Sequence, residues 1–374
     1  IFISTPRLWG DADGDFTPHC VLTNFPANGE CGAIQNAAFG QARPVTTWGE
    51  AARSGWNVRE YSYQYALALQ HELRGGLGIT VEYHRNDWKN QQATINRAVA
   101  ASDFTPFCVT APTDARLGKV SGQRVCGLYD VNPNRVGQVN SERVRIEDIE
   151  GATGRPKEQF NGVDFGANAR FGNGALVMGG ITMGRTVFDT CWQNDLPHVT
   201  QNGVSSTLPR SDAFCNVTPD WWNGVGSQVK LQIVYPLPYG FTVSGSYKNL
   251  PGIPITAAFV VSNAVARAGL GRDLAACLGA ANCTATYTAE LAPSLSSSGN
   301  TAATLYDNRL NQVDLRFTRT FRVGGGRIQG IAEVYNAMNT RVAQGIVTTY
   351  GPAWQLPFSI LGGRLFKFGA QIDF

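Results

Sequence analysis

The chain has 374 residues, of which 42 are glycine and only 16% are charged, and its formal net charge is +3. Lys and Arg are scattered and nearly balanced by acids, so the basic footprint of a nucleic-acid-binding protein is missing and no nucleic acid is expected as a partner. No run of 18 apolar residues occurs, so the sequence offers no transmembrane helix. The chain opens without Met and without a signal peptide, which indicates a mature product or a piece of a longer protein.

Residues 1–58 are expected to form mainly loop. Within them, the carboxylates of Asp11, Asp13 and Asp15 surround Gly14, and such oxygen ligands suit a hard cation such as Ca²⁺. The position at which an EF-hand has its glutamate is Leu22. An Asx-type turn is the alternative that we favour. Ca²⁺ is therefore the one candidate cofactor, and no other is expected.

Eight cysteines are spread over the chain, and each pair of sequence neighbours lies within one irregular segment. Paired thiols on loops predict an oxidising compartment such as the periplasm or the cell exterior. Free or metal-bound cysteines are the alternative, which the lack of any CxxC motif disfavours. Locality along the chain favours four disulfides: Cys20–Cys31, Cys108–Cys126, Cys191–Cys215 and Cys277–Cys283.

Four β-hairpins are predicted after residue 58, because runs of alternating apolar and polar residues flank short turns rich in glycine or proline. In the first hairpin, Tyr63, Leu67 and Val81 share one face, whereas Glu82 and His84 fall on the other. The hairpins span 59–84, 163–183, 228–248 and 312–336, with turns at 74–76, 172–174, 236–240 and 324–326.

Residues 358–374 predict a ninth, closing strand with an alternating apolar face that includes Phe366 and Phe368. The order polar, x, Gly, x, x, apolar, x, Phe resembles the C-terminal assembly signal of bacterial outer-membrane β-barrels. The residues that fit this signal are Lys367, Gly369, Ile372 and Phe374.

Long irregular segments separate the hairpins, at 90–158, 188–223, 250–308 and 338–357, and the first three carry one cysteine pair each. Short turns at one end of the strands and long loops at the other are the layout of outer-membrane barrels. The predicted fold is all-β: nine or ten antiparallel strands of a transmembrane β-barrel with long disulfide-braced extracellular loops. An alanine-rich stretch at 257–281 is a candidate short helix, and a soluble β-sandwich is the alternative fold.

The face predicted to line the barrel carries charges of both signs. A wall of one sign would suggest ion selection, whereas a mixed wall suits contact with a folded plug or a polar substrate. A merely wetted barrel interior is the alternative. The charged residues of this face are Glu72, Glu82, Asp164, Arg170, Lys230, Lys248, Asp314, Arg316, Glu333, Lys367 and Asp373.

Catalytic residues are not predicted, and the protein is not expected to be an enzyme. Only four histidines occur, and the HExxH, GxSxG and Walker A motifs are missing. His71 with Glu72, and His84 with Glu82, resemble acid–base pairs, but residues lining a wet interior explain them better.

Ligand-binding residues are not identified by the sequence. Six tryptophans fall in expected outward loops, where their rings either stack on sugar or aromatic ligands or pack on one another. They are Trp9, Trp48, Trp192, Trp221, Trp222 and Trp354.

Several stretches are similar to the TonB-dependent receptor family, and in particular to its Oar-like branch, whose members carry an N-terminal carboxypeptidase-regulatory-like domain. The resemblance covers essentially the whole chain and is most specific in its last third. The stretches are 64–73, 107–112, 125–130, 161–164, 169–174, 235–240, 309–316, 334–339 and 350–354.

This resemblance implies a barrel of 22 strands filled by a plug, located in the bacterial outer membrane with its loops extracellular and its C-terminus periplasmic. It implies import of a scarce, bulky ligand with energy passed on by TonB through the plug. The plug and the first twelve or thirteen strands have no counterpart here, and Ile1–Trp9 would be the end of the strand before residue 59. The implied partners are outer-membrane lipid, the barrel assembly machinery, TonB and an unidentified ligand. A passive porin-like, structural or adhesive barrel is the alternative.

Overall fold

The computed structural model describes residues 7–24, 26–34, 46–201, 208–222, 226–280, 283–297 and 300–374. The chain divides into two compact units, Ile1–Thr46 and Thr47–Phe374. Strands dominate the described residues and helices are few and short, which confirms the prediction of an all-β, antiparallel architecture. No helix in the described part is long and apolar enough to cross a membrane.

The first unit contains a small disulfide-linked hairpin. β1 (Arg7–Trp9) pairs antiparallel with β2 (Cys31–Ile34), and Cys20 is bonded to Cys31. β1 and β2 form a sheet of their own. Residues 1–6 lie outside the described part, and pairing with β2 occupies only one edge of β1, so it stays a prediction that Ile1–Trp9 ends a strand of the barrel.

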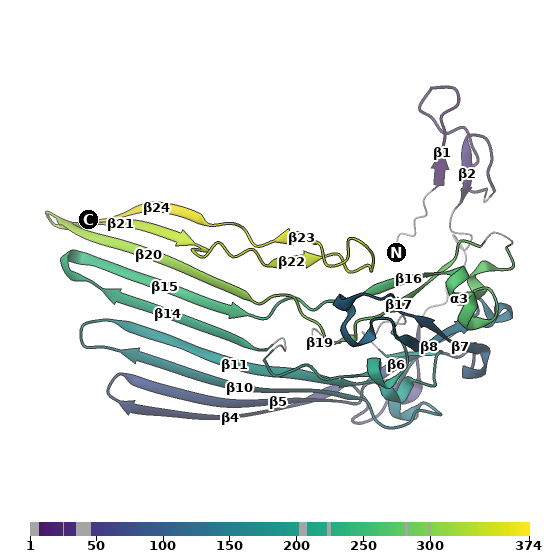
Figure 1. Ribbon diagram of the computed structural model, residues 1–374, viewed down its shortest axis with the longest axis horizontal. Helices are drawn as coiled ribbons and strands as arrows, with labels where there is room; N and C mark the ends of the chain where they lie inside the picture. Colours follow the sequence, from purple (N-terminus) through teal and green to yellow (C-terminus); the bar gives the residue numbers. More distant parts are fainter. Residues whose placement is uncertain are drawn as a thin grey trace. The chain divides into compact units, whose positions relative to one another are not determined.

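Nine long strands of the described chain form the main sheet of the second unit (Figure 1). Every neighbouring pair is antiparallel, in the spatial order β24-β21-β20-β15-β14-β11-β10-β5-β4, and the short β13 (Asn216–Val217) pairs with the end of β11 as a tenth member. The number and direction of the long strands are as predicted. Their bounds are β4 (Tyr61–Arg74), β5 (Leu77–Lys89), β10 (Lys157–Arg170), β11 (Leu176–Asp189), β14 (Gln228–Pro236), β15 (Phe241–Leu250), β20 (Leu310–Val323), β21 (Gly326–Tyr335) and β24 (Leu365–Asp373).

The hairpin turns are tight, and the first one depends on glycine. Gly76 has φ +85°, and a Cβ at this position would lie 2.4 Å from the carbonyl oxygen of Arg170. The Arg170 N–H donates to the Gly76 carbonyl at 2.7 Å. Glycine therefore provides both the left-handed backbone and the close contact that joins the first hairpin to the second.

The closing strand is shorter than predicted. β24 begins at Leu365, whereas β23 (Pro357–Ile360) pairs with β22 (Ala343–Ile346) in a separate hairpin. The partner strand β21 ends at Tyr335, and the following Asn336 has φ +50°, so the ladder has no partner for residues before 365. The alternating sequence pattern therefore begins at residue 358, whereas hydrogen bonding of this segment to β21 begins only at Leu365.

The register shows that the strands are inclined. Leu77 at the start of β5 is in register, through four intervening strands, with Leu315 of β20. Leu315 stands eight residues before Val323, where β20 reaches its turn. At about 3.3 Å per residue and about 4.8 Å between strands, the turns shift about 26 Å along the strands over about 24 Å of width. The strands therefore tilt by about 45°, an inclination typical of closed barrels.

The long segments between the hairpins fold together at the end of the sheet remote from the turns (Figure 1). We call the described parts of 90–156, 190–227, 251–309 and 336–364 the loop cap. Except for β13, its strands pair in small separate sheets, one of which includes β3. The short helix α1 follows β3 just before β4. The bounds are β3 (Thr47–Trp48), β6 (Gln92–Asn96), β7 (Phe104–Thr110), β8 (Arg124–Val131), β9 (Ser141–Arg145), β12 (Val199–Gln201), β16 (Ala258–Ser262), β17 (Thr286–Glu290), β18 (Ser294–Ser297), β19 (Asn300–Ala303), α1 (Glu50–Arg53), α2 (Asp212–Cys215) and α3 (Asn263–Leu270).

The candidate helix at 257–281 is found, in shorter form, as α3. The Ser262 hydroxyl accepts a hydrogen bond from the Val265 N–H at its start, and Gly271 with φ +76° ends it. Residues 258–262 before it are strand β16, and Ala281 lies outside the described residues. Serine at the N-cap and glycine in the left-handed conformation are the expected end signals of a helix.

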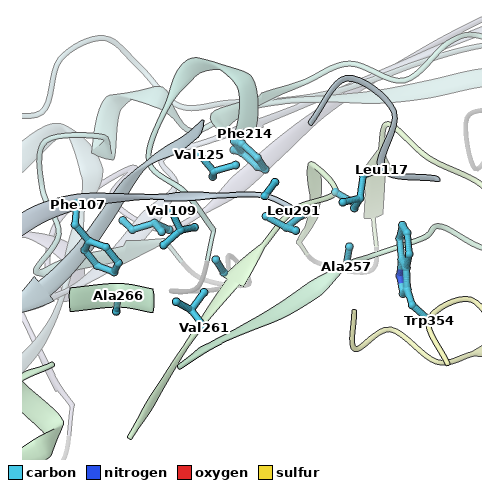
Figure 2. Close-up of a cluster of buried hydrophobic side chains, with 14 of the residues drawn as sticks. Phe107, Val109, Leu117, Val125, Phe214, Ala257, Val261, Ala266, Leu291 and Trp354 are labelled. Carbon is cyan, nitrogen blue, oxygen red and sulfur yellow. The ribbon is translucent and has the colours of Figure 1, made fainter. Parts of the chain in front are cut away.

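The loop cap has its own hydrophobic core (Figure 2). Phe107, Phe214, Val261, Leu291 and Trp354 come from all the long segments and are buried together. Three of the long segments each contain one disulfide: Cys108–Cys126, Cys191–Cys215 and Cys277–Cys283. Together with the disulfide of the first unit, these are the four pairs that locality favours.

Trp354 is the largest fully buried side chain of this core, and its Nε1 donates to the Thr256 carbonyl at 2.9 Å. Substitution Trp354→Ala should lower the free energy of unfolding of the loop cap by about 3–5 kcal/mol, because it leaves a large cavity. Denaturant unfolding followed by near-UV circular dichroism measures this loss. Trp56, 98% exposed, is the matched control, and Trp56→Ala should change stability by less than about 0.5 kcal/mol. Equal losses of unfolding free energy in the two variants would contradict the burial of Trp354 in this core.

Candidate functional site

One face of the main sheet is apolar and exposed to its surroundings. Leu67 is 74% exposed and Phe368 is 77% exposed. Cross-strand register places these side chains in continuous rows across the strands. We call this surface the apolar face, and its exposed large side chains include Tyr63, Tyr65, Leu67, Leu69, Tyr83, Phe165, Ile181, Leu231, Ile233, Tyr235, Phe241, Phe317, Phe321, Phe366, Phe368 and Ile372.

The apolar face has polar borders at both ends of the strands. Toward the loop cap, Arg85, Asn161 and Arg185 lie side by side on β5, β10 and β11. The Tyr83 hydroxyl, one row nearer the turns, donates to Asn161 Oδ1 at 2.9 Å. Toward the turns, Arg319 lies over two phenylalanine rings of the apolar face, at 4.7 and 4.5 Å. Aromatic rings and long cationic side chains at the edge of an apolar zone are typical of a membrane interface.

The opposite face, which we call the polar face, carries the eleven charged residues predicted for the barrel lining. Their charges are interleaved. Glu333 lies 3.7 Å from Arg316 and 3.3 Å from Lys367, its neighbours on both sides. Lys248 Nζ lies 4.0 Å from Asp314. The polar face is therefore a mixed, largely self-compensated surface.

A histidine and two acids form a compact cluster on the polar face. His84 Nε2 lies 3.3 Å from Glu82 and 3.0 Å from Asp164. Both contacts use the same ring nitrogen, and the two carboxylates are directly opposite in the register. The cluster has the ligand types of a cation site, and its three groups already contact one another through the His84 ring nitrogen.

The second sequence pair, His71 and Glu72, is divided by the sheet. His71 is opposite Ile79, on the apolar face, whereas Glu72 is opposite Gly78, on the polar face. Adjacent residues of a strand point to opposite sides, so these two groups cannot act on one molecule. The assembly-signal residues divide in the same way, with Lys367 and Gly369 on the polar face and Ile372 on the apolar face.

The three carboxylates of Asp11, Asp13 and Asp15 lie together, as expected, within 4.8 Å of one another. Asp11 accepts hydrogen bonds from the Gly14 and Phe16 N–H groups at 2.7 and 3.1 Å. His19 lies between the other two, with its ring nitrogens 3.0 Å from Asp13 and 3.4 Å from Asp15. Asp13 and Asp15 each accept a hydrogen bond from the N–H two residues on, at 3.3 and 2.8 Å, as in Asx turns. The clustered oxygens leave Ca²⁺ binding as a prediction.

The six tryptophans do not form one ligand surface. Trp192 and Trp354 are 2% and 0% exposed, so they pack in the core and cannot stack on a ligand. Trp48, Trp221 and Trp222 are partly exposed and lie against arginines. In the first unit, the Trp9 indole N–H donates to a carboxylate of the same unit. The amino-acid composition of the loops does not indicate which tryptophans are buried or which contact arginines.

Charged groups inside the loop cap hold its shape. Burial raises the pKa of the Glu290 carboxyl, which accepts hydrogen bonds from two backbone N–H groups. Burial lowers the pKa of the Arg210 guanidinium to about 10, and this group donates to two backbone carbonyls at 2.7 and 2.6 Å. Hydrogen bonds from Arg116 lower the pKa of Asp114 to about 2. These groups stabilise the loops and offer no reactive centre.

No protein-family model matches the chain, and no curated protein matches its sequence. Among solved structures, the chain is similar to the outer membrane transporter YddB from Escherichia coli, with a TM-score of 0.40 and 10% identity over 85% of this chain. The chain spans 33% of the length of that structure.

Calcium should protect the first unit from proteolysis if Asp11, Asp13 and Asp15 bind the ion, because coordination would tie the loop at 11–19 together. The measurement is limited digestion of the full chain with and without millimolar Ca²⁺, followed by mass spectrometry of fragments from 1–58. Asp13→Asn should abolish the protection, and Asp195→Asn, outside this unit, should retain it. Equal cleavage with Ca²⁺ and with a chelator would leave only the Asx turn.

Proposed function

We propose that this chain forms part of the wall of a bacterial outer-membrane β-barrel that imports a scarce, bulky ligand, as the resemblance to TonB-dependent receptors implies. The exposed apolar face of the main sheet carries the proposal. The nine strands together are about 38 Å wide, and the apolar residues extend over about 20 Å along each strand. The apolar face therefore has a projected area of more than about 700 Å². Monomeric soluble proteins rarely expose apolar patches beyond about 300–600 Å², so a hydrocarbon surrounding explains this face.

The backbone of the main sheet also suits lipid. Each inner strand is hydrogen-bonded on both sides, and only β4 and β24 have a free long edge among the described residues. An open edge is not tolerated in hydrocarbon, where unpaired N–H and C=O groups cost several kcal/mol each. Together with a tilt of about 45°, these two edges support a larger barrel in which further strands continue the sheet on both sides.

The interleaved charges of the polar face support an importer with an occupied interior. A ring of one charge would favour selective ion flow. Alternating acids and bases instead match the surface of a folded protein domain, which also carries both signs. We infer that this face contacts a plug, which would be the route to TonB, and the cargo that passes it.

The two ends of the strands fit the two sides of the outer membrane. The loop cap carries three disulfides and a core, which suits the oxidising exterior. The tight turns lie at the opposite end, together with the C-terminal end of β24 (Figure 1). In the proposed orientation this end is periplasmic, where the barrel assembly machinery would meet Lys367, Gly369, Ile372 and Phe374. The surrounding lipid is the third partner.

Conductance of the natural protein in planar lipid bilayers separates an importer from a passive pore. A plugged barrel should show no constant current steps in KCl until denaturant unfolds the plug, and the steps should then disappear again when denaturant is washed out. The membrane alone with the same denaturant is the control. Constant steps from the moment of insertion would contradict the importer and support a porin-like barrel.

A further inference from the structure

Two lysines of the polar face stand directly opposite each other on neighbouring strands. Lys230 of β14 and Lys248 of β15 are cross-strand partners. Like charges in directly opposed positions destabilise a sheet unless a counter-charge lies near. Asp314 lies 4.0 Å from Lys248 Nζ, but Lys230 forms no ion pair with any described residue. Within the described part of the chain, one positive charge of the pair is therefore left without an ion-pair partner.

The lysine pair borders a hollow of about 540 Å³ in the polar face. Gly166 and Gly180, in register on β10 and β11, form part of its floor. A Cβ at Gly180 would lie 2.4 Å from the carbonyl oxygen of Phe165, so the backbone itself is the surface there. The volume falls within the range of small-molecule sites, roughly 300–1,000 Å³.

The chemistry of the lining is that of an anion site. No Asp or Glu is among the residues that line the hollow, whereas the two lysines share the lining with hydroxyl and amide side chains. The acids Glu82 and Asp164 lie on β5 and β10 and are bridged by His84. The lining residues whose side chains can donate hydrogen bonds, besides the lysines, include Thr80, Asn168, Thr182, Gln228, Gln232 and Ser246.

We propose that this hollow binds the anionic group, a phosphate or a carboxylate, of a small solute inside the barrel. Lys230 supplies the uncompensated charge, Lys248 the second ammonium, and the glycine floor the room for the rest of the solute. Ammonium groups bind such oxyanions by charge-assisted hydrogen bonds. The inference rests on the proposed function, because it takes the polar face as the barrel lining.

Calorimetric titration of the natural protein in detergent micelles, with inorganic phosphate and separately with citrate, tests this site. At least one of the two anions should bind, and Lys230→Met should weaken that binding roughly tenfold, the typical effect of losing one charge-assisted hydrogen bond. Lys230→Arg should retain most of the affinity, which would show that charge at this position is what matters. The anion that binds more tightly identifies the chemistry.

The matched control is Lys367→Met. Lys367 is a lysine of the same face but is paired with Glu333 at 3.3 Å, so its loss should change affinity by less than twofold. Failure of both anions to bind, or an equal loss in the Lys230→Met and Lys367→Met variants, would overturn the proposal. This titration needs no transport, so a barrel that proves passive in bilayers could still bind the anion. The importer and the anion site can therefore fail independently.

Discussion

In the membrane location that we propose, the main sheet depends on one constraint: backbone N–H and C=O groups surrounded by hydrocarbon have to be satisfied within the sheet. Antiparallel strands linked by tight turns meet this demand with neighbours in sequence, which is why the order of the main sheet follows the chain without a crossover. Every second side chain is then free to face lipid and the others to face a wet interior. The exposed apolar face and the interleaved charges of the polar face are the two consequences of that single geometry.

In the loop cap, unlike in the main sheet, many large apolar side chains are buried inside. In the strands large apolar side chains point outward, as Phe368 does with 77% exposure, whereas in the cap Trp354 is completely buried. The cap lies beyond the polar border at Arg85, Asn161 and Arg185, and its segments pack a core as a water-soluble domain does. Its disulfides and buried charges fix the mouth above the proposed interior. A rigid cap of this kind would define which solutes reach the hollow beside Lys230.

Much of the main sheet could be predicted from the sequence, because alternation at period two is a direct record of two different surroundings. Nine strands, their antiparallel order and the shared face of the charged residues all follow from it. The pattern failed at 358–364, because alternating side chains do not show where backbone pairing with β21 ends. Burial of Trp192 and Trp354, and the separation of His71 from Glu72, depend on contacts between segments far apart in sequence. The opposition of Lys230 and Lys248 depends likewise on strand register, which side-chain alternation within each run does not specify.

The central claim is that the apolar face meets hydrocarbon, and neighbouring residues of β14 test it most directly. All cysteines of the described chain are in disulfides, so the variants Leu231→Cys and Gln232→Cys of the natural protein can each carry one nitroxide label in lipid vesicles. The account predicts that the label at 231 collides mainly with oxygen dissolved in the bilayer, whereas the label at 232, one residue away, collides mainly with a water-soluble nickel chelate. Equal access of the chelate to both positions would show that neither face meets lipid and would contradict the membrane-spanning sheet.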